Sequence, residues 1–184
     1  MSVHLVFETH ATTLDNELGV ATGWLPGELS AEGRRQAALL GERRRDDGVD
    51  VVVSSDLARA VETVRIAFHG SGISWQQDRR LRECHYGELN GARVERLAPR
   101  TAYLDRPFPG GQSYGDVVAA TRAFLRDATR RFAGSRVLVV SHSANRWALQ
   151  HLLEGVPLAD LVDAPFRWQP GWEFTVPGDW ATDT

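Results

Sequence analysis

Three short apolar runs, each ending in polar residues, constrain the fold of this chain more than any other feature. They occupy residues 5–7, 49–53 and 137–140, and the last two are almost entirely valine and leucine. Short β-prone runs of this kind are typical of strands that are buried on both faces of a parallel sheet. The sequence therefore predicts a central sheet that contains these three segments.

Segments with helical character separate the apolar runs. Residues 30–46 are rich in Ala, Leu, Glu, Gln and Arg, and a helix from about residue 57 to 69 follows Ser54-Ser55-Asp56, which we interpret as its N-cap cluster. Ser113 and Asp116 indicate a capping box for a helix that ends near Gly134, and residues 145–153 form a further helix. Alternation of strands and helices predicts a single α/β domain over residues 1–184, a three-layer α/β/α sandwich with a mainly parallel sheet.

Two regions are less regular. Residues 73–112 are expected to be mostly loop and short helix, and the tail carries a predicted strand at residues 172–176. We interpret the tail tryptophans Trp168, Trp172 and Trp180 as core or subunit-contact residues, which leaves a homodimer open, in preference to a substrate platform.

Composition excludes several classes of function. Twenty-one basic and 24 acidic residues give a net charge of −3, which argues against nucleic-acid binding and against an anionic membrane surface. The single cysteine, Cys84, cannot form an intrachain disulfide and is expected to be a small packing residue. With no signal-peptide pattern at the N-terminus, we expect a cytoplasmic protein.

Polar residues stand directly after the three predicted strands. These are His10, the segment 54–59 that contains Arg59, and His142. Ligands of open α/β sheets bind beyond the carboxyl ends of the strands, where helix N-termini also favour an anion. Two imidazoles and a guanidinium at such an edge suit phosphoryl transfer, with one imidazole as nucleophile.

Six motifs, in order, resemble those of the histidine phosphatase superfamily, which has the phosphoglycerate-mutase-like fold. Thr9-His10-Ala11-Thr12 with Asn16 is similar to the family's Arg-His-Gly-Glu…Asn. The other five are Leu29 to Ala37, Ser54 to Thr63, Leu81 to Gly91, Pro109-Gly110-Gly111-Gln112-Ser113, and Val137 to His142. Together they extend over about residues 3–150.

The resemblance implies a role for each matching residue. His10 would form a phosphohistidine, Arg59 and His142 would bind the phosphoryl oxygens, and Glu83 would be the general acid and base. Asn16 would add a hydrogen bond to the phosphate, and no cofactor or metal is required. Hydroxyl groups from Thr9, Thr12 and Ser143 are further candidates for substrate binding. The expected substrate is a phosphate monoester of a small metabolite.

The sequence departs from the family pattern at three positions. Thr9 replaces an arginine, Ala11 a glycine and Thr12 a glutamate. Loss of the guanidinium removes a bidentate phosphate contact. Arg82 or Arg146 could replace the charge, the substrate could carry less charge, or catalysis could be lost.

Three functions therefore remain in view. The favoured one is a phosphatase, ahead of a mutase because the family's mutases are generally longer. The second is a catalytically silent relative that binds a phosphorylated ligand or a protein partner. The third is a lyase or isomerase that uses the same pocket for an anionic metabolite.

Overall fold

A five-stranded sheet in the order β4-β3-β6-β1-β7 forms the centre of the protein. The structure, a computed structural model, describes residues 1–180. The predicted strands are β1 (Val3–Thr9), β3 (Val51–Ser54) and β6 (Arg136–Ser141), and the tail strand is β7 (Trp172–Val176). All neighbouring strands are parallel except the β1–β7 pair, which confirms the mainly parallel sheet.

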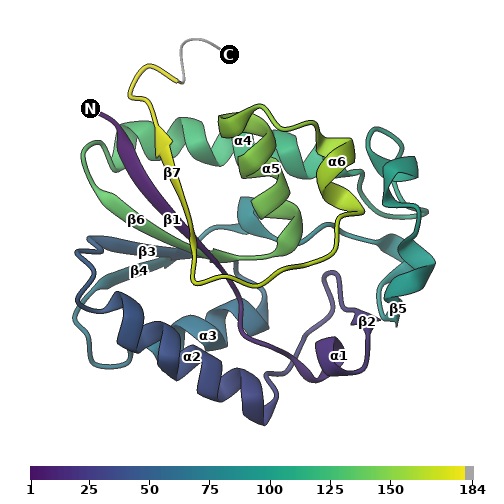
Figure 1. Cartoon of the computed structure of the whole chain (residues 1–184), viewed down its shortest axis with the longest axis horizontal. Helices are drawn as coiled ribbons and strands as arrows, with labels where there is room; N and C mark the ends of the chain where they lie inside the picture. The colour runs from purple at the N-terminus through teal and green to yellow at the C-terminus, as the bar shows by residue number, and fades with distance from the viewer. Residues whose placement is uncertain (181–184) are drawn as a thin grey trace.

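Helices cover both faces of this sheet. Figure 1 shows α4 (Tyr114–Arg131) and α5 (Ser143–Glu154) above it, with α2 (Ala31–Arg44) and α3 (Ala58–Phe68) below. Alternate residues of β1 point to opposite faces, so Leu5 and Phe7 join the core under α4 and α5, whereas Val6 packs against residues of α2 and α3. The expected α/β/α layering is therefore confirmed.

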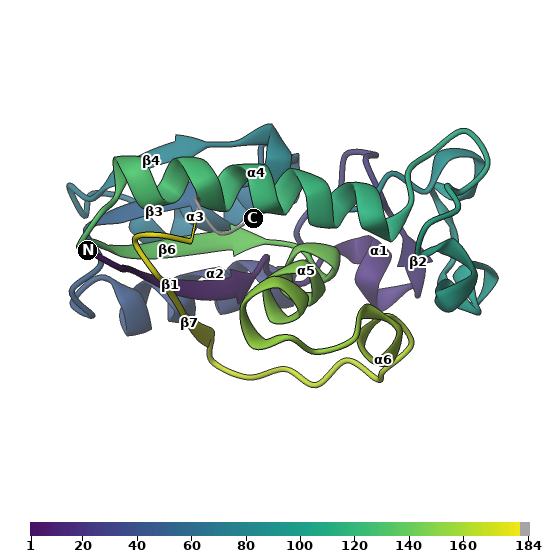
Figure 2. The same cartoon turned by 90° about the horizontal axis from the view of Figure 1, so that it is seen from above.

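Smaller elements gather beyond the carboxyl ends of the parallel strands. They are α1 (Leu14–Glu17), β2 (Val20–Ala21), β5 (Ala92–Arg93), α6 (Leu158–Val162), and four 3₁₀ turns at Arg79–Leu81, Gly87–Leu89, Val94–Leu97 and Arg100–Tyr103. Figure 2 shows α1, β2 and α6 at the end to which β6 points. These elements build walls around the sheet edge that carries His10 and His142.

The structure corrects two local predictions. Residues 73–112 include a strand of the central sheet, β4 (Ser74–Gln77), which was missed because its Ser-Trp-Gln-Gln sequence is polar and it lies at the sheet edge. The N-cap of α3 is Leu57, without a side-chain cap: the Ser55 hydroxyl accepts from the Leu57 N–H and contacts His142, and Asp56 pairs with Arg82. The capping box of Ser113 and Asp116 is confirmed.

Among residues 1–180, no helix is long and apolar enough to span a membrane.

Candidate active site

A cavity of about 840 Å³ opens at the carboxyl ends of β1 and β6. Seven of the eight predicted site residues line it, namely Thr9, His10, Thr12, Asn16, Arg59, Glu83 and Ser143. They come from segments far apart in the sequence, which the parallel sheet brings to one edge. The eighth, His142, is fully buried behind this lining.

The His10 ring is held in one orientation directly after β1. Its Nδ1 lies 2.8 Å from the carbonyl oxygen of Ala11, which can only accept, so Nδ1 carries the proton. Its Nε2 is then unprotonated, and its lone pair accepts a long hydrogen bond from Arg59 Nε at 3.3 Å. Burial, together with the Arg59 charge, lowers the pKa of His10 to about 3. At neutral pH, the His10 ring is therefore uncharged, and its Nε2 faces the guanidinium.

Arg59 is fixed in the first turn of α3 and is 2% exposed. Its Nη2 donates to the carbonyl of Gly23 at 2.8 Å and its Nη1 to that of Leu25 at 3.3 Å. Thr63 links this helix to the His10 loop, because its hydroxyl donates to the Arg59 carbonyl and accepts from the Ala11 N–H. These bonds hold the guanidinium beside His10.

Glu83 is a buried carboxyl group on another wall of the cavity. Its Oε1 accepts from the Cys84 N–H at 2.7 Å, and the backbone of Ala144 near the start of α5 also bonds it. Burial raises the pKa of Glu83, while these bonds and the charge of Arg59 oppose the increase. A carboxyl group with a raised pKa suits proton donation to a leaving group.

The imidazoles of His142 and His10 lie close together, with ring centroids 5.0 Å apart. His142 Nε2 is 2.9 Å from the Ser55 hydroxyl, and its buried Nδ1 has no hydrogen-bond partner among the described residues. Burial and the nearby Arg59 and His10 lower the pKa of His142 well below its usual value. His142 is not among the residues that line the cavity, so its role in phosphate binding stays a prediction.

The remaining predicted residues are partly engaged in local structure. Asn16 Oδ1 accepts from the Thr13 N–H in the capping box of α1, and the Thr12 hydroxyl donates to Gln36 at 2.9 Å. Thr9 ends β1 and Ser143 begins α5. All four side chains belong to the cavity lining, where each can contribute at least one further hydrogen bond.

Neither arginine proposed to replace the missing charge lines the cavity. Arg82 forms a bidentate pair with Asp56 at 2.6 and 2.7 Å, and Arg146 lies beneath the rings of Phe166 and Trp172. Arg43 and Arg100 line it instead.

Sequence reasoning also missed part of the cavity wall. Leu39 of α2 and Phe166 and Trp168 from the tail line the cavity. Trp168 is therefore not a core residue, and its place in a subunit contact stays a prediction. Trp172 does pack against the core, as predicted. The sequence carries no local signal for this wall, because only the fold shows which apolar side chains are exposed. Cys84 is buried as expected, and burial raises the pKa of its thiol.

The comparison with known families agrees with this geometry. The sequence profile of the histidine phosphatase superfamily, branch 1, matches residues 5–168. The chain belongs to this superfamily.

The proteins that resemble this chain include some named as mutases and some named as phosphatases. It is 31% identical over 157 residues to the "probable phosphoglycerate mutase GpmB" of Yersinia enterocolitica, which covers 80% of this chain and 73% of the relative. Bacillus stearothermophilus YhfR superposes with a TM-score of 0.80 at 26% identity, over 91% of this chain and 88% of YhfR. A mycobacterial glucosyl-3-phosphoglycerate phosphatase gives a TM-score of 0.75 at 29% identity, over 88% and 84% of the two chains.

Proposed function

We propose that this protein hydrolyses phosphate monoesters of small metabolites through a phosphohistidine on His10. The observation that carries the proposal is the meeting of an uncharged, lone-pair-bearing His10 Nε2, the Arg59 guanidinium and a buried Glu83 carboxyl in one cavity. A nucleophile, an electrophilic charge and an acid are the three components that phosphoryl transfer needs.

The reaction proceeds in two balanced steps. His10 Nε2 attacks phosphorus, the bond from phosphorus to the ester oxygen breaks, and Glu83 gives its proton to the departing alkoxide. Water then attacks the phosphohistidine, Glu83 takes a proton from it, and the P–N bond breaks to release inorganic phosphate. Arg59 stabilises the charge on the phosphoryl oxygens in both steps.

The names of the relatives are compatible with a phosphatase and with a mutase. The mycobacterial neighbour is named as a phosphatase and the Yersinia relative as a probable mutase. We favour hydrolysis because Thr9, in place of the expected arginine, weakens the hold on a phosphorylated intermediate that a mutase has to retain.

Release of phosphate from p-nitrophenyl phosphate tests the proposal. The wild-type protein should release phosphate without added metal, and His10→Ala should abolish the release. His69→Ala is the matched control, since His69 is an exposed histidine at the end of α3 and outside the cavity lining. Thermal stabilisation by orthovanadate without any turnover would reject hydrolysis and favour the silent, ligand-binding relative.

A further inference from the structure

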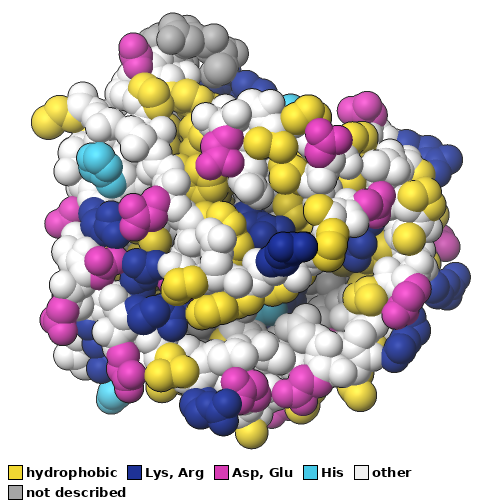
Figure 3. Space-filling view, in the orientation of Figure 1, with side chains coloured by type: hydrophobic (Ala, Val, Ile, Leu, Met, Phe, Trp, Pro, Cys, Tyr) yellow, Lys and Arg dark blue, Asp and Glu magenta, His cyan; other side chains and the backbone are white. Residues whose placement is uncertain are grey.

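One side of the cavity is an exposed surface of apolar and aromatic side chains. It consists of Leu39 and Arg43 from α2 and Phe166 and Trp168 from the segment between α6 and β7, and we call it the aromatic wall. Leu39, Phe166 and Trp168 are 44%, 53% and 61% exposed. Figure 1 shows this segment crossing between α5 and α2, and Figure 3 shows hydrophobic side chains beside basic ones around the middle of the same face.

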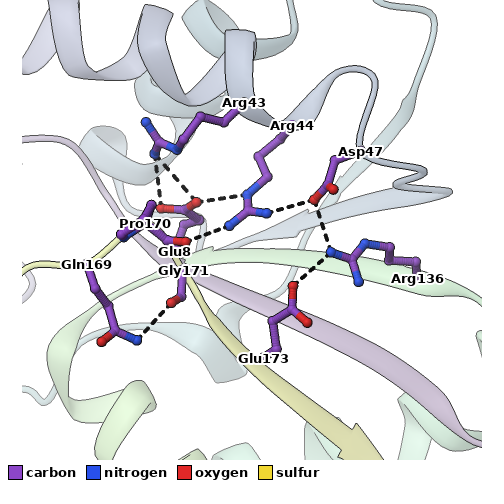
Figure 4. Close-up of polar contacts among 9 residues, drawn as sticks. All are labelled: Glu8, Arg43, Arg44, Asp47, Arg136, Gln169, Pro170, Gly171 and Glu173. Atoms are coloured by element: carbon purple, nitrogen blue, oxygen red, sulfur yellow. Dashed lines mark hydrogen bonds and ion pairs between the residues drawn. The ribbon is translucent and has the colours of Figure 1, made fainter.

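The aromatic wall is anchored on its inner side. Arg44 donates from Nε to Glu8 at 2.9 Å and from Nη2 to the carbonyl of Pro170 at 2.9 Å, which ties the tail segment to α2 and to β1 (Figure 4). The Arg43 guanidinium lies 5.6 Å from the centroid of the Trp168 ring. The Arg146 guanidinium packs against Phe166, 5.5 Å from the centroid of its ring. The backbone is thus anchored two residues beyond Trp168, and each of the two exposed rings contacts a guanidinium.

Arg43 of the aromatic wall belongs to a chain of ion pairs. Figure 4 shows a chain of ion pairs in which three basic side chains meet three acidic ones, namely Arg43, Arg44 and Arg136 with Glu8, Asp47 and Glu173. On the other side of the cavity, Arg100 lies 3.9 Å from Asp163. Within residues 1–180, Arg59 is the one lining arginine without a carboxylate at ion-pair distance.

These contacts limit which chemical groups of a substrate, other than its phosphoryl group, the cavity favours. A second anionic group on the substrate would compete with Glu8 for Arg43 or with Asp163 for Arg100, and it would also approach the carboxylate of Glu17 on the rim. An uncharged planar group instead gains contact with exposed rings and removes apolar surface from water.

We infer that the aromatic wall binds the alcohol portion of the substrate, and that this portion is an uncharged aryl or extended apolar group. The inference rests on the proposed function, because it places the phosphoryl group at His10 and Arg59. It favours aryl and arylalkyl phosphates over phosphorylated hydroxy acids and bisphosphates.

Two alkyl substrates with similar leaving groups test the inference by turnover. The kcat/KM for 2-(1-naphthyl)ethyl phosphate should exceed that for ethyl phosphate by about tenfold or more. The kcat/KM for 3-phosphoglycerate should also be lower than that for 2-(1-naphthyl)ethyl phosphate. Trp168→Ala should reduce the naphthylethyl-to-ethyl ratio about fivefold to tenfold, and Trp168→Phe should restore most of it. Leu18→Ala is the control, because Leu18 is an equally exposed apolar residue outside the lining. Equal ratios in wild type and Trp168→Ala would overturn the inference.

Calorimetric binding separates this inference from the proposed function. Naphthylmethylphosphonate should bind the wild-type protein about tenfold more tightly than methylphosphonate, and Trp168→Ala should remove this difference. If that pattern appears without turnover of any ester, the proposed function fails and the inference holds. If esters are hydrolysed but the two phosphonates bind equally, the inference fails and the proposed function holds.

Discussion

At the scale of single residues, Thr9 is the position where this chain differs most from the motifs of its superfamily, because it stands in place of an arginine. Thr9 lines the cavity beside His10, and Arg59 supplies the adjacent positive charge. A charged hydrogen bond contributes about 1.5–3 kcal/mol, which corresponds to about one to two orders of magnitude in kcat/KM. Thr9→Arg should therefore raise kcat/KM for phosphate monoesters by about tenfold to a hundredfold.

The control for this prediction is Thr9→Gln, which adds length and hydrogen-bonding capacity without charge. Steady-state kinetics on p-nitrophenyl phosphate at low and high salt would measure both variants. A gain in Thr9→Gln equal to that in Thr9→Arg would show that charge is not what the position lacks.

Glu83 should control the pH dependence of the reaction. The group acts as an acid only while protonated, so kcat for alkyl esters should fall as pH rises through its pKa, which burial raises. On the acidic side, activity should fall as pH approaches about 3, the pKa at which His10 Nε2 becomes protonated. The optimum for alkyl esters is thus expected between about pH 3 and the raised pKa of Glu83.

Substitution of Glu83 by glutamine tests this assignment directly. General acid catalysis typically contributes about 10² to 10⁴ in rate, so Glu83→Gln should lose about that factor on ethyl phosphate. Formation of the phosphohistidine from p-nitrophenyl phosphate should be much less affected, because its leaving group needs no proton. Equal losses on both substrates would argue that Glu83 positions other groups and does not transfer the proton.

At the scale of elements, the close contact between α2 and the His10 loop depends on one glycine. A Cβ at Gly33 would lie 1.9 Å from the backbone carbonyl oxygen of Thr12, so the loop or the helix would have to shift. Glycine to alanine normally stabilises a helix interior by about 0.5–1 kcal/mol. Here Gly33→Ala should instead destabilise the fold by at least about 1–3 kcal/mol, the usual cost of overpacking, and lower activity.

Urea denaturation monitored by circular dichroism would measure the effect on stability. Arg35→Ala, at an exposed position of the same helix, should change the free energy of unfolding by less than about 0.5 kcal/mol. A Gly33→Ala protein at least as stable as the wild type would contradict the close-packing argument.

The elements also show why some of the fold could be predicted and some could not. The strands around β6 are valine-rich runs buried on both faces, and Ser113 with Asp116 is a local capping signal, so both are visible in the sequence. The polar strand β4 and the cap of α3 depend on distant partners: β4 pairs with β3, and Ser55 contacts His142. No local pattern encodes such contacts.

At the scale of the whole molecule, the same distinction applies to the site. Polar residues after three predicted strands sufficed to bring His10, Arg59 and His142 together, because parallel strands share a carboxyl edge. The aromatic wall could not be predicted in this way. Its residues come from the second half of α2 and from an irregular segment, and Arg44 joins the two by donating to the Pro170 carbonyl.

Two imidazoles that stay neutral in the folded state should make the stability of the whole protein depend on pH. An unfolded histidine titrates near pH 6.5, whereas the pKa of His10 is lowered to about 3 and that of His142 is also well below its usual value. Between these limits the unfolded state binds more protons, so the free energy of unfolding falls as pH drops below about 6.5. Each histidine contributes a slope of up to about 1.4 kcal/mol per pH unit.

Glu83 acts in the opposite sense, because a raised pKa lets the folded state keep a proton that the unfolded state has lost. Its contribution to stability is therefore present at low pH and decreases as pH rises through the raised pKa, which reduces the net slope. Urea denaturation between about pH 4.5 and 6.5 should show that the free energy of unfolding still declines toward acid. His142→Asn should reduce the slope of this decline by the equivalent of about one bound proton, whereas His69→Asn, at an exposed position, should leave the slope unchanged. An unchanged slope in His142→Asn would mean that the second imidazole does not stay neutral in the folded protein.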